Sequence, residues 1–414
     1  MKLLGARRAI SGLGLGLLIP CSSFAAGLQT LEQGTWDMGR AVVGAMSAGD
    51  SAATAYYNPA AMTLLDRPQA VGGVMGISGE SRFDSNSRTT ASGGDGGNQS
   101  GNAVAPAGPF YVHPLNEEWA VGFSVTAPIV GALEPRDTWA GRYVITKLSL
   151  ATYRFGPSVA YRVNDWLSLG ATVGVNYSKL GFRVKIPSPI PGASDGKLRI
   201  SDADQWVVNY GLSALIEPWE GTRLGIAWNS EIDNDDLDGD ISLRGAAVGF
   251  ADDVEVKLTL PQYAVVSLRQ EVTDDLVLFA DVGWADFSEF NSIFIDTGGP
   301  VAINAETHFT DTIGYGIAAE YALSPEWTVS GGVSYASSPV SQSNRNAALP
   351  FDRQIRYGTG VRYKWREDVT FALSYEYLDL GSSKLTNTIS GETLSGKYST
   401  SKVQFLAFNV SKSF

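Results

Sequence analysis

The sequence predicts an all-β fold, a transmembrane antiparallel β-barrel of about 14 strands with an N-terminal segment inside its lumen. Three observations lead to this prediction. Apolar residues alternate with small or polar residues in many short runs, short and long connections alternate along the chain, and glycine is abundant (46 of 414 residues). After residue 25 no stretch of about 18 apolar residues occurs, so no transmembrane helix is expected.

Residues 1–25 have the composition of a signal peptide for export. A charged start is followed by the apolar run 10–19, which is too short to span a bilayer, and then by Ser23-Phe24-Ala25. Small residues at the first and third of these positions suit a signal peptidase, so we expect cleavage after Ala25. The mature chain then holds no cysteine, because Cys21 is the single one in the sequence.

The segment 26–68 is expected to form a hatch, or plug, inside the barrel. It has too little alternation for a strand and too many small residues for a good amphipathic helix. A barrel of about 14 strands encloses a lumen that is either a water channel or plugged. Small residues allow irregular backbone to pack closely against a wall.

The stretch 69–414 is expected to form the barrel wall. Runs such as 276–284, 315–323 and 371–377 place apolar residues on one face and small or polar residues on the other. A soluble β-sandwich would show the same alternation. The connections favour the barrel, because short turns alternate with long polar stretches, as in outer-membrane barrels. The turns are at 115–118, 164–165, 218–221, 273–275, 324–326 and 366–367, and the long stretches are 81–103, 129–141, 184–200, 234–252, 288–302, 337–354 and 381–399.

Aromatic residues at the strand ends are typical of an interfacial girdle. They are Trp119, Trp166, Trp219, Trp327 and Trp365. The chain ends in Phe414, in an alternating strand that Lys412 interrupts. We expect a multi-pass protein of the bacterial outer membrane, in contact with lipid and lipopolysaccharide. The net charge of -12 argues against a nucleic-acid partner.

Several motifs of the chain resemble those of the FadL family of outer-membrane transporters for long-chain fatty acids and other hydrophobic compounds. The resemblance covers nearly the whole mature chain. Its main motifs are Gly39-Arg40-Ala41, Tyr57-Asn58-Pro59-Ala60-Ala61-Met62, Asp137-Thr138-Trp139-Ala140-Gly141-Arg142-Tyr143 and Asp281-Val282-Gly283-Trp284-Ala285-Asp286-Phe287. One departure is Ala61, where the family usually has glycine.

The resemblance implies passive uptake of a hydrophobic molecule. An external groove would capture the ligand, a pocket inside the barrel would hold it, and a kink in the third strand would let it leave sideways into the membrane. No cofactor is implied, and a monomer is the expected state. The resemblance assigns Asn58, Pro59 and Ala60 to the hatch, although Asn-Pro also favours an ordinary turn.

The third strand, expected at 119–128, contains the candidate kink residues Gly122 and Pro128, because proline cannot donate to a strand ladder and glycine weakens it. The alternative for Pro128 is that it simply ends the strand. The external stretch 129–141 supplies apolar ligand-binding candidates, for which ordinary loop packing is the alternative. They are Ile129, Val130, Leu133 and Trp139.

Arg142 and Arg154 have the same parity on the expected fourth strand and are candidates to point into the lumen. An inward arginine is suited to bind a fatty-acid carboxylate in a bidentate manner. The alternative is that both pair with acids of the wall or hatch.

Other classes of function have weaker support. The two histidines, His113 and His308, are expected at opposite ends of the barrel, so no Ser-His pair of an enzyme can be assembled near one rim. The acidic run 233–240 lacks the glutamate that a calcium-binding loop requires, because Gly245 stands there, so we expect a solvated loop and no metal. A general diffusion porin for small polar solutes remains the alternative, and it would need no hatch.

Overall fold

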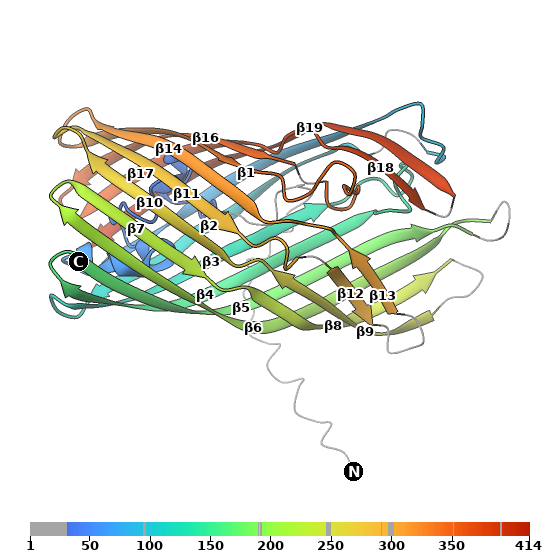
Figure 1. The fold of residues 1–414 in the computed structure, drawn as a ribbon, viewed down its shortest axis with the longest axis horizontal. Coiled ribbons are helices and arrows are strands. Elements are labelled where there is room, and N and C mark those ends of the chain that lie inside the picture. The colour runs from blue at the N-terminus through green and yellow to red at the C-terminus, as the bar shows by residue number, and fades with distance from the viewer. Residues whose placement is uncertain are drawn as a thin grey trace, which may run out of the picture.

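The computed structural model describes residues 31–93, 97–188, 190, 193–245, 250–290, 292–296, 302–350, 352–389 and 391–414. The expected signal peptide and the first residues of the expected hatch lie outside the described residues. The described residues form a closed wall of antiparallel strands around a long axis, with a short N-terminal segment inside it (Figure 1). Of the helices described, none has the length and apolar character needed to cross a membrane.

The described strands join in one 19-stranded sheet. In chain order they are β1 (Gln69–Ser85), β2 (Gln99–Pro114), β3 (Trp119–Leu133), β4 (Lys147–Asn164), β5 (Leu167–Ile186), β6 (Gly196–Trp219), β7 (Thr222–Asn229), β8 (Ile232–Arg244), β9 (Phe250–Leu260), β10 (Tyr263–Glu271), β11 (Leu276–Ala285), β12 (Ser292–Asp296), β13 (Ala302–Glu306), β14 (Thr312–Ala322), β15 (Trp327–Ala336), β16 (Gln354–Arg366), β17 (Val369–Asp379), β18 (Lys384–Ile389) and β19 (Glu392–Ser413).

Five of the described wall-crossing segments are each divided into two consecutive strands, so that each such pair counts as one strand position of the barrel. The pairs are β7 with β8, β9 with β10, β11 with β12, β13 with β14, and β17 with β18. The described strands therefore make a closed antiparallel barrel of 14 positions, which confirms the predicted fold class. β1 pairs with β19 from Gln69↔Ser413 onward, and this pairing closes the wall. Closure satisfies backbone groups that an open sheet edge would leave unpaired in lipid.

The observed connections agree with the predicted ones at one end of the barrel and differ from them at the other end. The short predicted turns are confirmed, and they lie at the end that holds the C-terminus (Figure 1). Short turns are on the periplasmic side of outer-membrane barrels, so we call this the periplasmic end and the opposite one the outer end, or outer rim. The expectation that the long polar stretches are loops is wrong in extent, because strands continue into most of them. The acidic run 233–240, for example, lies on β8, and β8 pairs with β6 and β9. Above a membrane both faces of a strand can be polar, so hydropathy does not mark where such a strand ends.

The outer face of the wall carries the predicted aromatic girdle. Trp119, Trp166, Trp219, Trp327 and Trp365 are 41–66% exposed, and each lies beside a short turn. Lys412, the interruption in the last strand, forms an ion pair with Asp368 in the turn before β17. Its ammonium group also lies 5.9 Å from the ring centroid of Phe414. The charge therefore sits at the end of the barrel, beside a turn.

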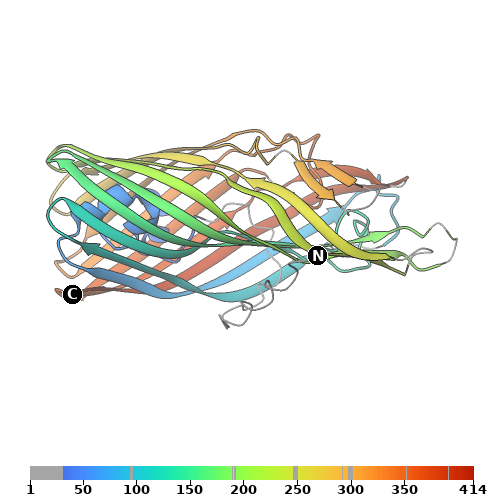
Figure 2. The same cartoon turned by 90° about the horizontal axis from the view of Figure 1, so that it is seen from below.

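Residues 31–68, which we call the hatch segment, lie inside the wall at the end that holds the C-terminus (Figure 2). The segment contains three short helices, η1 (Trp36–Arg40), α1 (Thr54–Tyr57) and η2 (Pro59–Leu64). Residues 32–49 and 52–62 are all buried. The helix η1 contacts β14 to β17, whereas α1 and η2 contact the wall from β2 to β6.

Ion pairs attach one side of the hatch segment to the wall. Arg40 is fully buried, pairs with Asp37, and has Nη1 2.9 Å from Oε1 of Glu320 on β14. Glu32 lies 2.6 Å from Nε of Arg356 on β16. Burial raises the pKa of the Glu32 carboxyl, but Arg356 and hydrogen bonds outweigh burial, so this pKa lies below its usual value. Glu32 is therefore an anion at neutral pH.

Candidate functional site

Three buried polar side chains form a row across the inner wall. Thr126 on β3 lies directly opposite Arg154 on β4, and Arg154 lies directly opposite Asn176 on β5. Their exposed fractions are 5%, 3% and 0%. We call these three residues the head-group row.

The head-group row has unused hydrogen-bonding capacity. Nη1 of Arg154 donates to Oδ1 of Asn229 at 3.0 Å. Within the described part of the chain, Nε and Nη2 of Arg154, Oγ1 of Thr126 and Oδ1 of Asn176 have no hydrogen-bond partner, and no acid forms an ion pair with Arg154. The Tyr56 ring centroid lies 5.7 Å from the guanidinium carbon. A buried cation without an anion is costly, so this row is suited to receive a carboxylate.

An apolar cluster of the inner wall adjoins the head-group row. It begins at Ile129 on β3 and Leu150 on β4, which follow the row in the direction of the outer rim. Its other described members include Leu180, Ile200, Ala203, Ile232, Leu237, Ile241, Val254, Val256, Leu258, Leu260, Phe287, Phe290, Phe309, Val340 and Leu349. The arrangement places an apolar environment next to the cationic group of Arg154, which matches the apolar chain and the acidic head of a long-chain acid.

A small cavity connects the row with this cluster. It is lined by Pro128, Ile129 and Arg154, together with Asn209, Asn229, Ser230, Ile232, Leu260, Pro261 and Tyr263. Three of the sequence-predicted candidates thus lie at one site. The volume is only ≈ 20 Å³, whereas pockets for small molecules enclose about 300–1,000 Å³. A long-chain ligand therefore fits only after the surrounding side chains move apart.

The wall is interrupted between β2 and β3 beside this site. The two strands pair only from Phe110↔Ser124 to Pro114↔Ala120, while β2 continues along β1 and β3 continues along β4. Residues 100–109 of β2 and 125–133 of β3 face each other with no ladder pairing between them. We call this gap between the two strands the window. At its outer edge the side chain of Gln99 accepts a hydrogen bond from the amide of Glu134 at 2.6 Å.

The two kink candidates differ in their relation to the window. Pro128 lies at a bulge, because the β3–β4 register shifts between Thr126 and Ile129. Gly122 lies in the intact part of β3, opposite Val112 and Ser158. A Cβ added at Gly122 would collide with the sulfur of Met62 in the hatch segment, so this glycine provides space for the hatch instead.

The external apolar candidates are arranged differently from the expectation. Ile129, Val130 and Leu133 lie on β3, not in an external loop, because this strand runs to Leu133. Trp139 is 1% exposed and packs with Leu133, Phe83 and Tyr398 in a separate cluster under the outer loops. Leu133 and Trp139 thus contribute to the packing of the outer loops.

Arg142 does not lie on the fourth strand, so that expectation is wrong. It precedes β4 in a turn, where Nε is 3.1 Å from Asp195 and the other guanidinium nitrogens bind Ser92 and Tyr143. Its hydrogen-bonding groups therefore connect three outer segments to each other. Among the described residues, the pairing with an acid, which the sequence left open, applies to Arg142 and not to Arg154.

The Asn58-Pro59-Ala60 motif joins the hatch segment to β6. Nδ2 of Asn58 donates to the carbonyls of Met46 (2.6 Å) and Ala214 (3.2 Å), and its Oδ1 accepts from the amide of Ala60. That amide also lies 3.0 Å from Oγ of Ser213. Pro59 occupies the first turn of η2, where no amide hydrogen is needed. The motif therefore forms the turn that an Asn-Pro sequence favours, and it also contacts the barrel wall.

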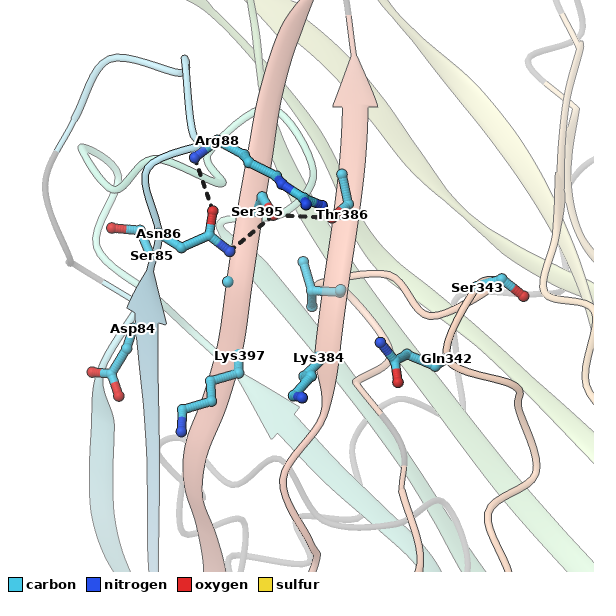
Figure 3. Close-up of a pocket in the computed structure, with 12 residues that line it drawn as sticks. Asp84, Ser85, Asn86, Arg88, Gln342, Ser343, Lys384, Thr386, Ser395 and Lys397 are labelled. Atoms are coloured by element: carbon cyan, nitrogen blue, oxygen red, sulfur yellow. Dashed lines mark hydrogen bonds between the residues drawn. The ribbon is translucent and has the colours of Figure 1, made fainter.

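A described cavity at the outer rim is polar. It encloses ≈ 670 Å³ and is lined by loop residues near Asn86 and Ser343 and by the strand residues Lys384 and Lys397 (Figure 3). Such a lining does not provide the apolar groove that the resemblance implies. Three exposed acids, Asp236, Asp238 and Glu255, lie close together on β8 and β9.

Sequence reasoning missed Thr126, Asn176 and the neighbouring hatch residue Gln33. The alternation of the fifth strand could have identified Asn176, because it has the same parity as Gly174 and Ser178. Thr126 has the parity of Gly122 and Ser124, so the alternation of the third strand could have identified it as well. No local signal marks Gln33, whose side chain accepts a hydrogen bond from the amide of Ala127, because this contact joins distant segments.

Comparison with known proteins agrees with this architecture. The family described as "Outer membrane protein transport protein (OMPP1/FadL/TodX)" matches residues 16–414. The long-chain fatty acid transport protein of Salmonella typhi is 25% identical over 399 residues, which cover 89% of this chain and 91% of the relative.

Two solved structures show the same fold. A FadL homologue of Pseudomonas aeruginosa has a TM-score of 0.85 at 21% identity, covering 94% of this chain and 100% of that one. The toluene transporter TodX of P. putida has a TM-score of 0.69 at 17% identity, covering 90% of this chain and 98% of that one. The chain therefore belongs to the OMPP1/FadL/TodX family of outer-membrane transport proteins and is a multi-pass barrel of the bacterial outer membrane.

Proposed function

We propose that this protein takes up long-chain hydrophobic molecules with an acidic head group, and that it moves them from the outer surface to the membrane by passive transport. The observation that supports this most strongly is Arg154, a buried cation beside an apolar cluster, two of whose nitrogens have no hydrogen-bond partner among the described residues. A fatty-acid carboxylate would pair with these nitrogens, while its chain would displace apolar side chains of the cluster.

The exit route of this proposal is sideways through the window. An apolar chain that crossed the periplasmic end would meet a polar cavity of ≈ 350 Å³, lined by residues such as Asp50, Arg362 and Lys364. Exit between β2 and β3 would deliver it directly to hydrocarbon, without exposure of the chain to water. Proline suits a strand edge that has no neighbour, because it has no amide hydrogen to donate to a ladder. Three prolines lie at the window, namely Pro106, Pro109 and Pro128.

The general porin is less well supported. A porin would need a water-filled lumen ringed by charges. In the described barrel the hatch segment is buried inside the wall at one end, and the apolar cluster occupies the inner wall above it. The relatives named for toluene transport make a neutral hydrocarbon the stronger competing cargo.

Ligand binding to the purified barrel in detergent tests the proposal. Palmitate and hexadecane are compared for the wild type, for Arg154→Met and for Arg142→Met, a control that removes another buried guanidinium. We expect Arg154→Met to weaken palmitate binding about 10- to 100-fold, because a charge-assisted pair is lost, and to leave hexadecane binding unchanged. The control should keep the wild-type preference for the acid. Equal binding of acid and alkane by the wild type would contradict the acidic head group and favour a hydrocarbon carrier.

A further inference from the structure

The polar cavity at the outer rim lies on the outer face of the wall. Tyr398 and Leu385 are 1% and 4% exposed and pack in the cluster under the outer loops. Neighbours along a strand point to opposite faces, so Lys397 on β19 and Lys384 on β18 point outward, and both are exposed. A ligand of this cavity therefore comes from the surroundings of the barrel and not from its lumen.

Cations dominate the described lining of this cavity. It contains Arg88, Lys384 and Lys397, which we call the rim cations, and one acid, Asp84. Lys384 lies directly opposite Lys397 in the β18–β19 ladder, and Asp84 lies opposite Lys397 in the β1–β19 ladder. Like charges directly opposite each other destabilise an antiparallel pair. One acid beside three cations leaves an excess of positive charge.

Other cations of the outer end have acidic partners. Arg183 and Lys197 lie 3.2 and 3.3 Å from Asp137, and Lys402 lies 3.1 Å from Glu80. In the part of the chain that the structure describes, no acid approaches a rim cation this closely. The repulsion between neighbouring cations falls when an anion lies between them, so the rim cations are suited to bind one.

The remaining lining supplies amide and hydroxyl groups. Figure 3 shows Gln342 beside Lys384, and Asn86 next to Ser395. Nδ2 of Asn86 donates to Oγ of Ser395 at 3.1 Å. Such groups bind the hydroxyls of a sugar, whereas lysine and arginine bind phosphate. The volume of ≈ 670 Å³ is within the range of pockets for small molecules, about 300–1,000 Å³.

The cavity lies well above the hydrocarbon part of the membrane. On the outer face of β19, the large apolar side chain nearest the outer end is Leu406, which is 53% exposed. Lys397 lies nine residues closer to the outer end. At a rise of about 3.3 Å per residue and a tilt of about 45°, this corresponds to a height of about 20 Å. The core sugars of lipopolysaccharide occupy this level, whereas the phosphates of its lipid A lie at the edge of the hydrocarbon.

We propose that the rim cations bind a phosphorylated core sugar of the lipopolysaccharide that surrounds the barrel. The phosphate lies between Lys384 and Lys397 and relieves their repulsion, and the amide and hydroxyl groups of the lining bind the sugar. The contact attaches the outer rim at β18 and β19 to the outer leaflet. It is independent of the cargo, because the cavity lies on the outer face of the wall.

A binding titration tests this site. The purified barrel in detergent is titrated with rough-form lipopolysaccharide that carries core phosphates, and the complexes are counted by native mass spectrometry. One variant combines Lys384→Gln with Lys397→Gln. The matched control combines Lys179→Gln with Lys257→Gln, which removes two exposed lysines of β5 and β9 and gives the same change in net charge. Heat-modifiability gels verify that each barrel is folded.

We expect the variant at residues 384 and 397 to bind this lipopolysaccharide about 5- to 30-fold more weakly, because two exposed charge pairs are lost. The control should stay within about twofold of the wild type. Lys384→Arg with Lys397→Arg should keep the wild-type affinity, since both charges remain. Lipopolysaccharide without core phosphates should bind to the wild type as weakly as the phosphorylated form binds to the glutamine variant.

Three results would overturn the proposal. An equal loss in the control would show that overall charge, and not this cavity, attracts the lipid. Full-strength binding of lipopolysaccharide without core phosphates would place the contact at lipid A. Displacement by an equimolar amount of inorganic phosphate would show a site for a free anion that does not recognise the sugar. Palmitate binding should be the same in all variants, so failure of the proposed function is a separate result.

Discussion

Three buried arginines of the lumen differ in their partners, and this difference assigns their roles. Arg40 and Arg356 each contact carboxylates, and both join the hatch segment to the wall. Arg154 has a comparable burial and no ion pair among the described residues. A buried ion pair stabilises an arrangement only when both partners are present, so Arg154 is the one of the three that is suited to an external anion.

Replacement of Arg40 should loosen the hatch segment. Arg40→Met leaves Asp37 buried without an ion-pair partner among the described residues, and it leaves Glu320 with only the more distant Arg362, at 3.6 Å. Loss of one partner of a buried ion pair costs about 3–5 kcal/mol in comparable cases. We expect amide hydrogen exchange at residues 36–48 to become at least about 100-fold faster, while the barrel strands keep their protection. Arg82→Met, at a side chain 55% exposed beside Glu80, serves as the control and should change neither. Unchanged exchange in the hatch would show that the ion pairs do not hold it.

At the scale of elements, the wall approaches the hatch segment through glycines. Added Cβ atoms at Gly170, Gly225, Gly332 and Gly358 would overlap the backbone of the hatch segment at Ala60, Met46, Arg40 and Ala41. Backbone can approach a strand this closely only where the strand has no side chain. The abundance of glycine in the sequence is therefore partly a packing requirement of the lumen.

A methyl group at one of these glycines should displace the hatch segment without unfolding the barrel. Gly225→Ala places a methyl on the carbonyl of Met46, so we expect increased ion conductance in planar bilayers and an unchanged barrel on heat-modifiability gels. Gly72→Ala is the matched control, because its methyl would meet only the carbonyl of Ala107, at 3.9 Å. Wild-type conductance in Gly225→Ala would contradict a tightly filled lumen.

The elements that depend on local chemistry could be predicted from the sequence. Alternation and turn residues gave the wall and its short turns, and parity within one strand gave the inward direction of Arg154. The same parity failed for Arg142, because residues 143–146 do not belong to the strand. The strand lengths predicted at the outer end were wrong, because a strand that is polar on both faces shows no change in hydropathy where it ends. The contact of Gln33 with Ala127 joins residues 94 positions apart, and only the folded chain brings them together.

At the scale of the whole molecule, the barrel has two ends of different character, and its described wall is interrupted between β2 and β3. The end with the short turns contains the hatch segment and a polar cavity. The middle contains the head-group row and the apolar cluster, and the window lies beside them. Under the proposed function, a hydrophobic cargo would pass from the apolar cluster to the window beside it and would avoid the polar cavity at the periplasmic end.

Photo-crosslinking of the cargo during transfer tests this lateral route most directly. A palmitate with a diazirine at its terminal carbon is supplied to the barrel in proteoliposomes, and the labelled residues are identified by mass spectrometry. The account predicts labels in the apolar cluster and at window residues 100–109 and 125–133. Labels on Asp50, Arg362 and the other residues of the periplasmic cavity would show axial passage and would contradict the account.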